Sequence, residues 1–168
     1  MLVLGIDPGT AVTGYGVVRT DVRGTPTLVE CGVVRTSADD PFPARLDQLF
    51  EAASELVARH RPELVAIEQV FLGKNVRSMV TLAHARAALL LAAQRGGVPI
   101  REYPPADVKK AITGTGGATK EQVAFMVTRL LRLAAPPAPA DAADGVAIAL
   151  TCLLRARTDA LIARAVGR

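Results

Sequence analysis

Cysteine and histidine are scarce in this sequence, with two of each among 168 residues. Cys31 and Cys152 stand far apart in apolar surroundings, and no Cys-x-x-Cys or Cys/His spacing typical of a zinc site occurs. His60 and His84 also have no partner at metal-ligand spacing, so we interpret both as structural residues. The two cysteines are interpreted as reduced core residues, the usual state of free cysteine.

Long apolar runs are also missing. The sequence is 50% hydrophobic, but charged residues interrupt every window of about 18 residues, which argues against a membrane span. The first residues have neither the basic region nor the small-residue cleavage site of a secretory signal. We therefore expect a cytoplasmic protein. Its length suits one domain with a sizeable core, which we assign to residues 1–157, followed by a short basic C-terminal tail, 158–168.

The charge is unevenly distributed along the chain. Residues 69–137 carry ten Lys and Arg against three Asp and Glu, whereas residues 1–68 carry six against ten. A local excess of positive charge suits a polyanionic partner such as nucleic acid, because each neutralised phosphate releases counterions. Ordinary solvated helix faces would explain the same excess, so charge alone leaves both interpretations open.

Apolar periodicity and turn residues predict three strands, a helix, a strand, a helix, a strand and then three helices. The first three strands suggest an antiparallel meander, and the later strands alternate with helices. This order predicts an α/β fold, a mixed five-stranded sheet with helices on both faces. The expected strands are 2–6, 13–19, 28–36, 64–67 and 98–102, and the expected helices are 43–60, 76–95, 105–112, 119–133 and 141–157.

Four acidic residues occur at the ends of predicted elements. Asp7 ends the first strand, Glu68 ends the fourth, and Asp141 and Asp144 begin the final helix. Each has an ordinary explanation, because strand ends favour polar residues and acids in a first helical turn complement the helix dipole. However, a right-handed crossover would place the first and fourth strands side by side and parallel. Asp7 and Glu68 would then emerge together at one edge of the sheet.

Several carboxylates in one pocket repel each other and are costly to bury unless cations are present. Hard oxygen ligands without His or Cys suit Mg²⁺, and Mn²⁺ can substitute. Two such ions, roughly 4 Å apart, can activate a water and stabilise the leaving oxygen of a phosphodiester during in-line displacement. The four acids therefore favour a metal-dependent nuclease.

Three sequence motifs, taken together, resemble the RuvC family of crossover junction endodeoxyribonucleases. The resemblance covers nearly the whole chain, to about Arg157, and the motifs occur in the family's order. They are Gly5-Ile6-Asp7-Pro8-Gly9-Thr10 with Thr13-Gly14-Tyr15-Gly16, Ala66-Ile67-Glu68-Gln69-Val70-Phe71 with Lys74-Asn75, and Ala140-Asp141-Ala142-Ala143-Asp144 with Ala147-Ile148-Ala149.

The resemblance implies a ribonuclease H-like fold and a homodimer that makes paired, Mg²⁺-dependent nicks in a Holliday junction, a four-way DNA junction. It also implies cooperation with a branch-migration complex, RuvA-RuvB. Asp7, Glu68, Asp141 and Asp144 match the family's catalytic, metal-binding acids. Some members of the family have histidine at the position of Asp141.

Three lysines and one phenylalanine are candidate DNA contacts. The loop 113–118 is rich in glycine but lacks the glycine before Lys120 that a Walker A motif needs, which excludes a nucleotide triphosphatase. A helix start beside this loop can bind phosphate, and the resemblance places DNA-contacting lysines at Lys109 and Lys120. Phe71 lies in the loop after Glu68, together with Lys74. We expect Phe71 to wedge between bases, or alternatively to pack in the core.

Other interpretations remain open at this point. An Asp-Pro-Gly-Thr turn after a first strand also opens actin-like sugar kinases, but those enzymes need two such domains and a longer chain. A non-catalytic junction-binding module is the second alternative, although four acids beside phosphates would not favour binding. The helix 76–95 is either a core helix or the dimer contact, since its small residues Ala83, Ala87 and Ala88 allow close helix packing.

Overall fold

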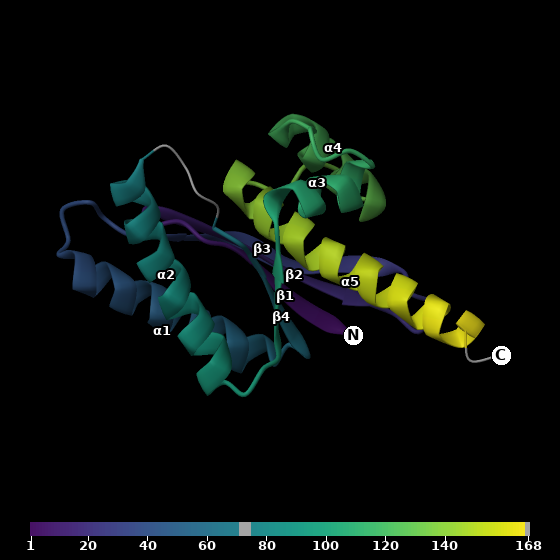
Figure 1. Cartoon of the computed structure of the whole chain (residues 1–168), viewed down its shortest axis with the longest axis horizontal. Coiled ribbons are helices and arrows are strands. Elements are labelled where there is room, and N and C mark those ends of the chain that lie inside the picture. The colour runs from purple at the N-terminus through teal and green to yellow at the C-terminus, as the bar shows by residue number, and fades with distance from the viewer. Residues whose placement is uncertain (71–74, 167–168) are drawn as a thin grey trace.

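The computed structural model describes residues 1–70 and 75–166, with side chains described as far as Asp159. Its centre is a five-stranded sheet in the order β3-β2-β1-β4-β5 (Figure 1). β2 pairs antiparallel with β1 and β3, whereas β4 pairs parallel with β1 and β5. The predicted mixed sheet is therefore confirmed. The strands are β1 Leu2–Asp7, β2 Val12–Thr20, β3 Pro26–Arg35, β4 Leu64–Glu68 and β5 Ile100–Tyr103.

Helices cover both faces of the sheet, and two of them, α1 and α2, lie on the face opposite the other three (Figure 1). Each face buries alternate residues of the same strands, because side chains of a strand point in opposite directions. In β1, Val3 packs on the side of α3, α4 and α5, and Leu4 packs on the side of α1 and α2. The helices are α1 Phe42–His60, α2 Val76–Arg95, α3 Pro105–Thr113, α4 Lys120–Leu130 and α5 Ala140–Val166.

Helix α5 lies against β1 and β2 at a distance that only glycine permits. A Cβ added to Gly145 would stand 2.5 Å from the Cα of Tyr15 in β2, and a Cβ on Gly5 would collide with the backbone of α5 at Gly145 and Ala149. Cβ atoms do not occur at such separations, so these glycines set how closely the helix approaches the sheet. The start of α5 is consequently held beside the end of β1.

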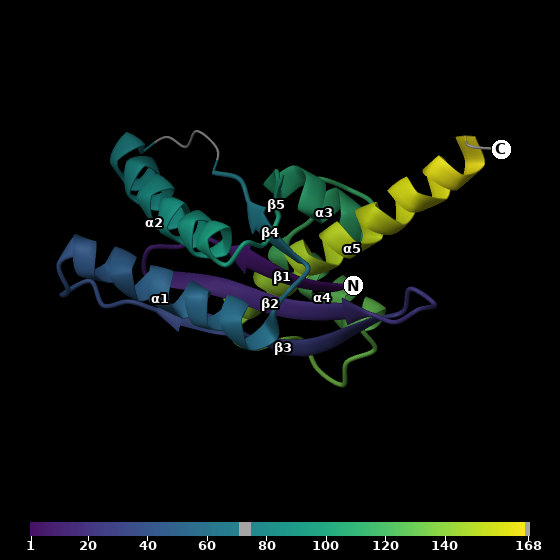
Figure 2. The ribbon, with the colours of Figure 1, turned by 90° about the horizontal axis from the view of Figure 1, so that it is seen from below.

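The final helix is longer than the sequence interpretation expected. We placed its end near Arg157 and described residues 158–168 as a tail, but α5 continues to Val166 (Figure 2). The expectation was wrong because no proline or glycine interrupts residues 146–166, and most of these residues favour a helix. Helix α4 differs in the other direction, since it ends at Leu130 rather than near 133.

Helix α2 is long and apolar enough, by length and composition alone, to cross a bilayer. In the fold it packs against α1, and its buried residues Ala85, Leu89, Ala92 and Ala93 belong to the core shared with β1 and β4. Such packing is ordinary for the outer helix of a folded domain.

Both histidines and both cysteines have structural surroundings. His60 Nε2 lies 2.8 Å from Glu30 Oε2, which joins the end of α1 to β3. The His84 ring faces Phe42 edge-on, and its Nδ1 lies 2.7 Å from the carbonyl oxygen of Val80. Cys152 is buried and Cys31 half-buried, both as free thiols. Cys152 therefore lies in the core as predicted, whereas Cys31 lies only partly in it, and the contacts of both histidines are those of structural residues.

The close approach of α5 gives a first prediction about stability. Gly5→Ala places a methyl group into the backbone of α5, so we expect the free energy of unfolding to fall by about 3 kcal/mol. Gly117→Ala is the matched control, because a Cβ there meets nothing closer than 4.0 Å. Urea unfolding of both variants measures the difference, and equal stability of the two would contradict the close contact.

Candidate active site

Asp7 and Glu68 lie side by side at one edge of the sheet. β1 and β4 are parallel neighbours in the register Ile6↔Ile67, and each acid is the next residue and the last of its strand. The expected crossover is therefore confirmed, and it brings together two carboxyl groups that are 61 residues apart in the sequence.

The turn after Asp7 is fixed by hydrogen bonds. The buried Thr13 hydroxyl donates to the carbonyl of Gly9 at 2.7 Å and accepts from the Gly9 amide at 3.1 Å. Arg45 of α1 donates to the carbonyl of Thr10 at 2.6 Å and to the Thr36 hydroxyl at 3.0 Å. These contacts hold the backbone that follows Asp7, so the acid has a defined place at the strand end.

The start of α5 brings a third acid to the same place. Asp144 lines a cavity of about 240 Å³ together with Asp7 and Glu68. Asp141 does not line this cavity, although its charge contributes to raising the pKa of Asp7. The backbone carbonyl of Asp141 packs against Gly14 of β2, the residue that pairs with Asp7. Three of the four predicted acids thus share one cavity, and Asp141 lies at its margin.

Burial and mutual repulsion change how two of these acids titrate. Burial, followed by the charge of Asp144, raises the pKa of Asp7 from 3.8 to about 7. Burial, followed by the charges of Asp7 and Asp144, raises the pKa of Glu68 from 4.5 to about 7. The charge of Asp144 therefore disfavours ionised Asp7 and ionised Glu68, and the charge of Asp7 disfavours ionised Glu68. A positive charge placed among them would reverse that effect.

Two lysines supply positive charge at the cavity. Lys120, the first residue of α4, places its Nζ 2.6 Å from Oδ2 of Asp144, and this hydrogen bond is the main cause of its raised pKa. Lys109 of α3 also lines the cavity, and its charge acts to lower the pKa of Glu68. Two of the three candidate DNA-contacting lysines thus lie at the acids, an arrangement that the sequence interpretation did not expect. A capping box of Thr119 and Gln122 begins α4, so Lys120 is the first residue of the helix.

The carboxyl groups are ligands of the kind that a divalent cation prefers, although their positions in this structure do not form a coordination shell. Within the described part of the chain, no three His, Cys, Asp or Glu side chains stand close enough to hold a metal ion between them. Nevertheless, three hard carboxylate donors face one cavity, and Lys120 already places a cationic group against Asp144. Oxygen donors of this kind fit Mg²⁺ or Mn²⁺, with remaining positions filled by water.

Two predicted contacts cannot be located. Phe71 and Lys74 belong to residues 71–74, which lie outside the residues that the structure describes. Their proposed contacts with DNA, and the alternative that Phe71 packs in the core, both stay predictions.

Sequence reasoning missed the arginines that support the two strand ends. Arg45 holds the turn after Asp7, as described above, and Arg86 of α2 donates from Nε to the carbonyl of Glu68 at 3.3 Å. Arg86 was detectable as an isolated charge in the apolar run 85–93. Arg45 carried no such signal, because charged residues surround it in the sequence.

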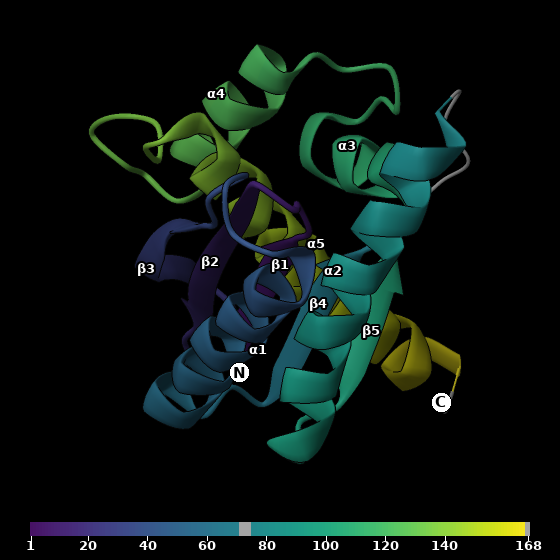
Figure 3. The ribbon, with the colours of Figure 1, turned by 90° about the vertical axis from the view of Figure 1, so that its left-hand side faces the viewer.

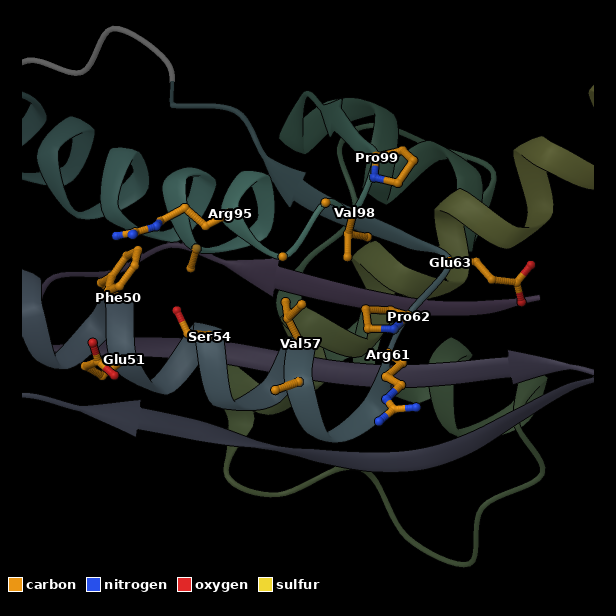
Figure 4. Close-up of a pocket in the computed structure, with 14 residues that line it drawn as sticks. Phe50, Glu51, Ser54, Val57, Arg61, Pro62, Glu63, Arg95, Val98 and Pro99 are labelled. Atoms are coloured by element: carbon orange, nitrogen blue, oxygen red, sulfur yellow. The ribbon is translucent and has the colours of Figure 1, made fainter.

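A larger cavity, about 880 Å³, lies at the opposite end of the sheet (Figure 4). Its walls come from the second half of α1, the end of α2 and the segments that lead into β4 and β5. Arg95 lies over the ring of Phe50 there at 5.8 Å. None of the four candidate acids lines this cavity, so its size alone does not make it the site of catalysis.

Comparison with known proteins identifies relatives of the whole chain. Residues 3–152 match the family model of crossover junction endodeoxyribonuclease RuvC. The protein of that name from Salinispora arenicola is 48% identical over 169 residues, which span 100% of this chain and 96% of the relative. The one from Streptomyces coelicolor is 47% identical over 168 residues, 99% of this chain and 89% of the relative.

Solved structures give the same result. Thermus thermophilus RuvC is 39% identical with a TM-score of 0.87, covering 95% of this chain and 97% of that one. The T. thermophilus RuvC in complex with Holliday junction substrate is 37% identical with a TM-score of 0.86, covering 94% of this chain and 96% of that one. The expected ribonuclease H-like fold is therefore confirmed. Because the family model and these relatives match along nearly its whole length, this chain belongs to the RuvC family of crossover junction endodeoxyribonucleases.

Proposed function

We propose that this protein resolves Holliday junctions by nicking two opposed DNA strands, using Mg²⁺ held by Asp7, Glu68 and Asp144. The observation that carries the proposal is the cavity in which these three carboxyl groups face one another while two of them have a pKa of about 7. Such an arrangement is unfavourable in the fold unless a cation compensates it. Asp141, at the margin, would orient the site or bind a second ion.

The side chains divide the work as follows. Asp7, Glu68 and Asp144 would hold the divalent cations, with Asp141 beside them, and the bound cations would supply an activated water and neutralise charge on the phosphodiester. Lys120 and Lys109 lie at the cavity rim and bind the phosphates on either side of the scissile bond. Lys120 would contact DNA where Asp144 holds a cation instead of its ammonium group. Phe71 and Lys74, outside the described residues, would add DNA contacts, with Phe71 stacking on a base at the crossover.

Paired nicks require two active sites, and α2 supplies a suitable dimer face. Within the described part of the chain, its outward side carries an exposed apolar stripe, along which Val76 is 70% exposed, Val80 50% and Leu91 58%. The exposed Ala83 and Ala87 lie between them at helical spacing, so a second helix can approach closely. Ala88 faces the core instead, at 9% exposure, so it does not belong to this stripe. We further propose that the homodimer works in the cytoplasm with a RuvA-RuvB branch-migration complex.

The catalytic proposal predicts that Asp7→Asn separates cutting from binding. Removing one carboxylate disables cation binding but no basic contact, so we expect nicking of a synthetic mobile four-way junction in Mg²⁺ to fall by roughly 100-fold or more. Binding of the same junction in Ca²⁺, which we expect not to support cutting, should change less than twofold.

Asp47→Asn is the control for this experiment, because Asp47 is an exposed acid on α1 and should leave both activities unchanged. Parallel loss of binding and cutting in Asp7→Asn would contradict the proposal. A wild-type protein that binds junctions but never nicks them would instead support the non-catalytic binding module.

The raised pKa values predict how the acids affect stability with pH. Asp7 titrates near 4 in the unfolded chain and near 7 in the fold, so the folded state holds the extra proton in between. Its contribution to the free energy of unfolding therefore falls as the pH rises from about 4 to 7 and stays low above that range. Without divalent cations, Asp7→Asn should be more stable than wild type at pH 8, by about 2 kcal/mol.

That advantage should disappear at pH 4, where Asp7 is largely protonated. Addition of Mg²⁺ at pH 8 should raise the melting temperature of wild type more than that of Asp7→Asn. Thermal unfolding with and without chelator measures both effects. Equal free energies of unfolding of the two proteins at pH 8 in chelator would show that ionised Asp7 does not destabilise the fold.

The lysines predict a change in salt dependence. Lys109→Ala and Lys120→Ala each remove a phosphate contact, so the slope of log binding constant against log salt should decrease in magnitude by about one. Lys110→Ala is the control, since Lys110 is the exposed neighbour of Lys109 and does not line the cavity. Junction binding in Ca²⁺ across a salt series measures the slopes. An unchanged slope would show that both lysines are solvated surface charges without a phosphate contact.

A further inference from the structure

Arg86 joins helix α2 to the end of the strand that carries Glu68. Its Nε donates to the backbone carbonyl of Glu68 at 3.3 Å, and its terminal Nη2 forms an ion pair with Glu102 of β5. The side chain is 19% exposed, so the guanidinium lies mostly under other atoms rather than in solvent. Figure 3 shows α2 lying in front of β4 and β5, the strands that carry its two partners, Glu68 and Glu102.

The bonded carbonyl lies at a sensitive position. β4 ends at Glu68, and the next amide, that of Gln69, still donates to the carbonyl of Tyr103 in β5 at 2.9 Å. The peptide group between Glu68 and Gln69 is therefore held twice. Its N–H donates to β5, and its carbonyl accepts from Arg86 of α2. A shift of this peptide would move the Glu68 carboxylate relative to Asp7 on the neighbouring strand.

A guanidinium suits this task better than an ammonium group. It is planar, with donors at Nε and at both terminal nitrogens, so it can serve a carbonyl and a carboxylate at once in a fixed geometry. Lysine offers one point charge on a flexible stem and cannot hold both partners in the same way. A charged residue in the middle of an Ala- and Leu-rich helix also costs desolvation energy, which Glu102 compensates.

Arg86 also stands next to the outward stripe of α2. Ala83 and Ala87, three residues before it and one after, are exposed on that stripe. A protein that packs on this stripe of α2 would therefore contact the same helix that carries Arg86.

We propose that Arg86 is a positioning residue that, with Glu102, sets the place of Glu68 in the cation site and links that place to the position of α2. The inference rests on the proposed function, because it assigns Arg86 to the site that Glu68 forms with Asp7 and Asp144. Partners of metal ligands commonly change affinity or activity by 10- to 100-fold when removed.

The test measures cation binding without DNA, as the Mg²⁺ concentration that gives half of the maximal rise in melting temperature. We expect Arg86→Ala and Arg86→Lys to raise this concentration roughly tenfold. Glu102→Gln keeps the guanidinium but loses the ion pair, so its effect should be smaller, in the same direction. Arg95→Ala is the control, because Arg95 lies on the same helix against Phe50, at the opposite end from Glu68.

A second measurement follows nicking of the junction in Mg²⁺ and its binding in Ca²⁺. Arg86→Lys, which keeps the charge, should lower turnover about tenfold while its junction affinity stays within twofold of wild type. If both Arg86 variants melt at lower temperature but keep the wild-type Mg²⁺ midpoint and turnover, Arg86 only fastens the helix to the sheet and the proposal is overturned. Failure of wild type to nick the junction would overturn the proposed function, whereas the Mg²⁺ midpoints would still decide the role of Arg86.

Discussion

The close contact of α5 with β1 and β2 is the constraint on which the site depends. Gly5 and Gly145 remove the side chains that would hold the helix away, and the backbones then meet directly. A helix standing farther off would leave Asp144 away from the cavity that Asp7 and Glu68 line. Asp144, which this helix carries, is also one of the charges that, after burial, raise the pKa of both strand-end acids. Geometry and electrostatics of the site thus have one structural origin.

The two helical layers contribute different kinds of residue. On one face, α5 brings Asp144, and α3 and α4 bring Lys109 and Lys120 to the same cavity. On the other face, α1 and α2 bring Arg45 and Arg86, whose guanidinium groups donate to backbone carbonyls just after Asp7 and at Glu68. The first layer therefore supplies the groups that meet cation and phosphate, and the second holds the strand ends that present the acids.

The sequence alone predicts the sheet, the helices on its two faces and the acids at the ends of the elements, because each has a local signal. Alternation and turn residues mark the strands, and acids at the ends of two parallel neighbours must meet. The position of Asp141 at the cavity margin could not be predicted, since two acids three residues apart on one helix turn look equivalent in a sequence. The end of α5 near Arg157 was also predicted wrongly, because the helix continues to Val166 and no helix-breaking residue occurs between the two positions.

The ion pair of Lys120 with Asp144 also follows from packing that no local pattern records. α4 has its own capping box, so the sequence determines where the helix begins, but only its packing on α5 determines what its first side chain meets. An exposed lysine beside a glycine-rich loop would stay solvated. Here it faces three carboxyl groups, so the charge that attracts DNA also offsets the repulsion among the acids. A divalent cation held by Asp144 would compete with Lys120 for this carboxylate, and a phosphate would compete with Asp144 for the same ammonium group, so cation and phosphate binding would be coupled.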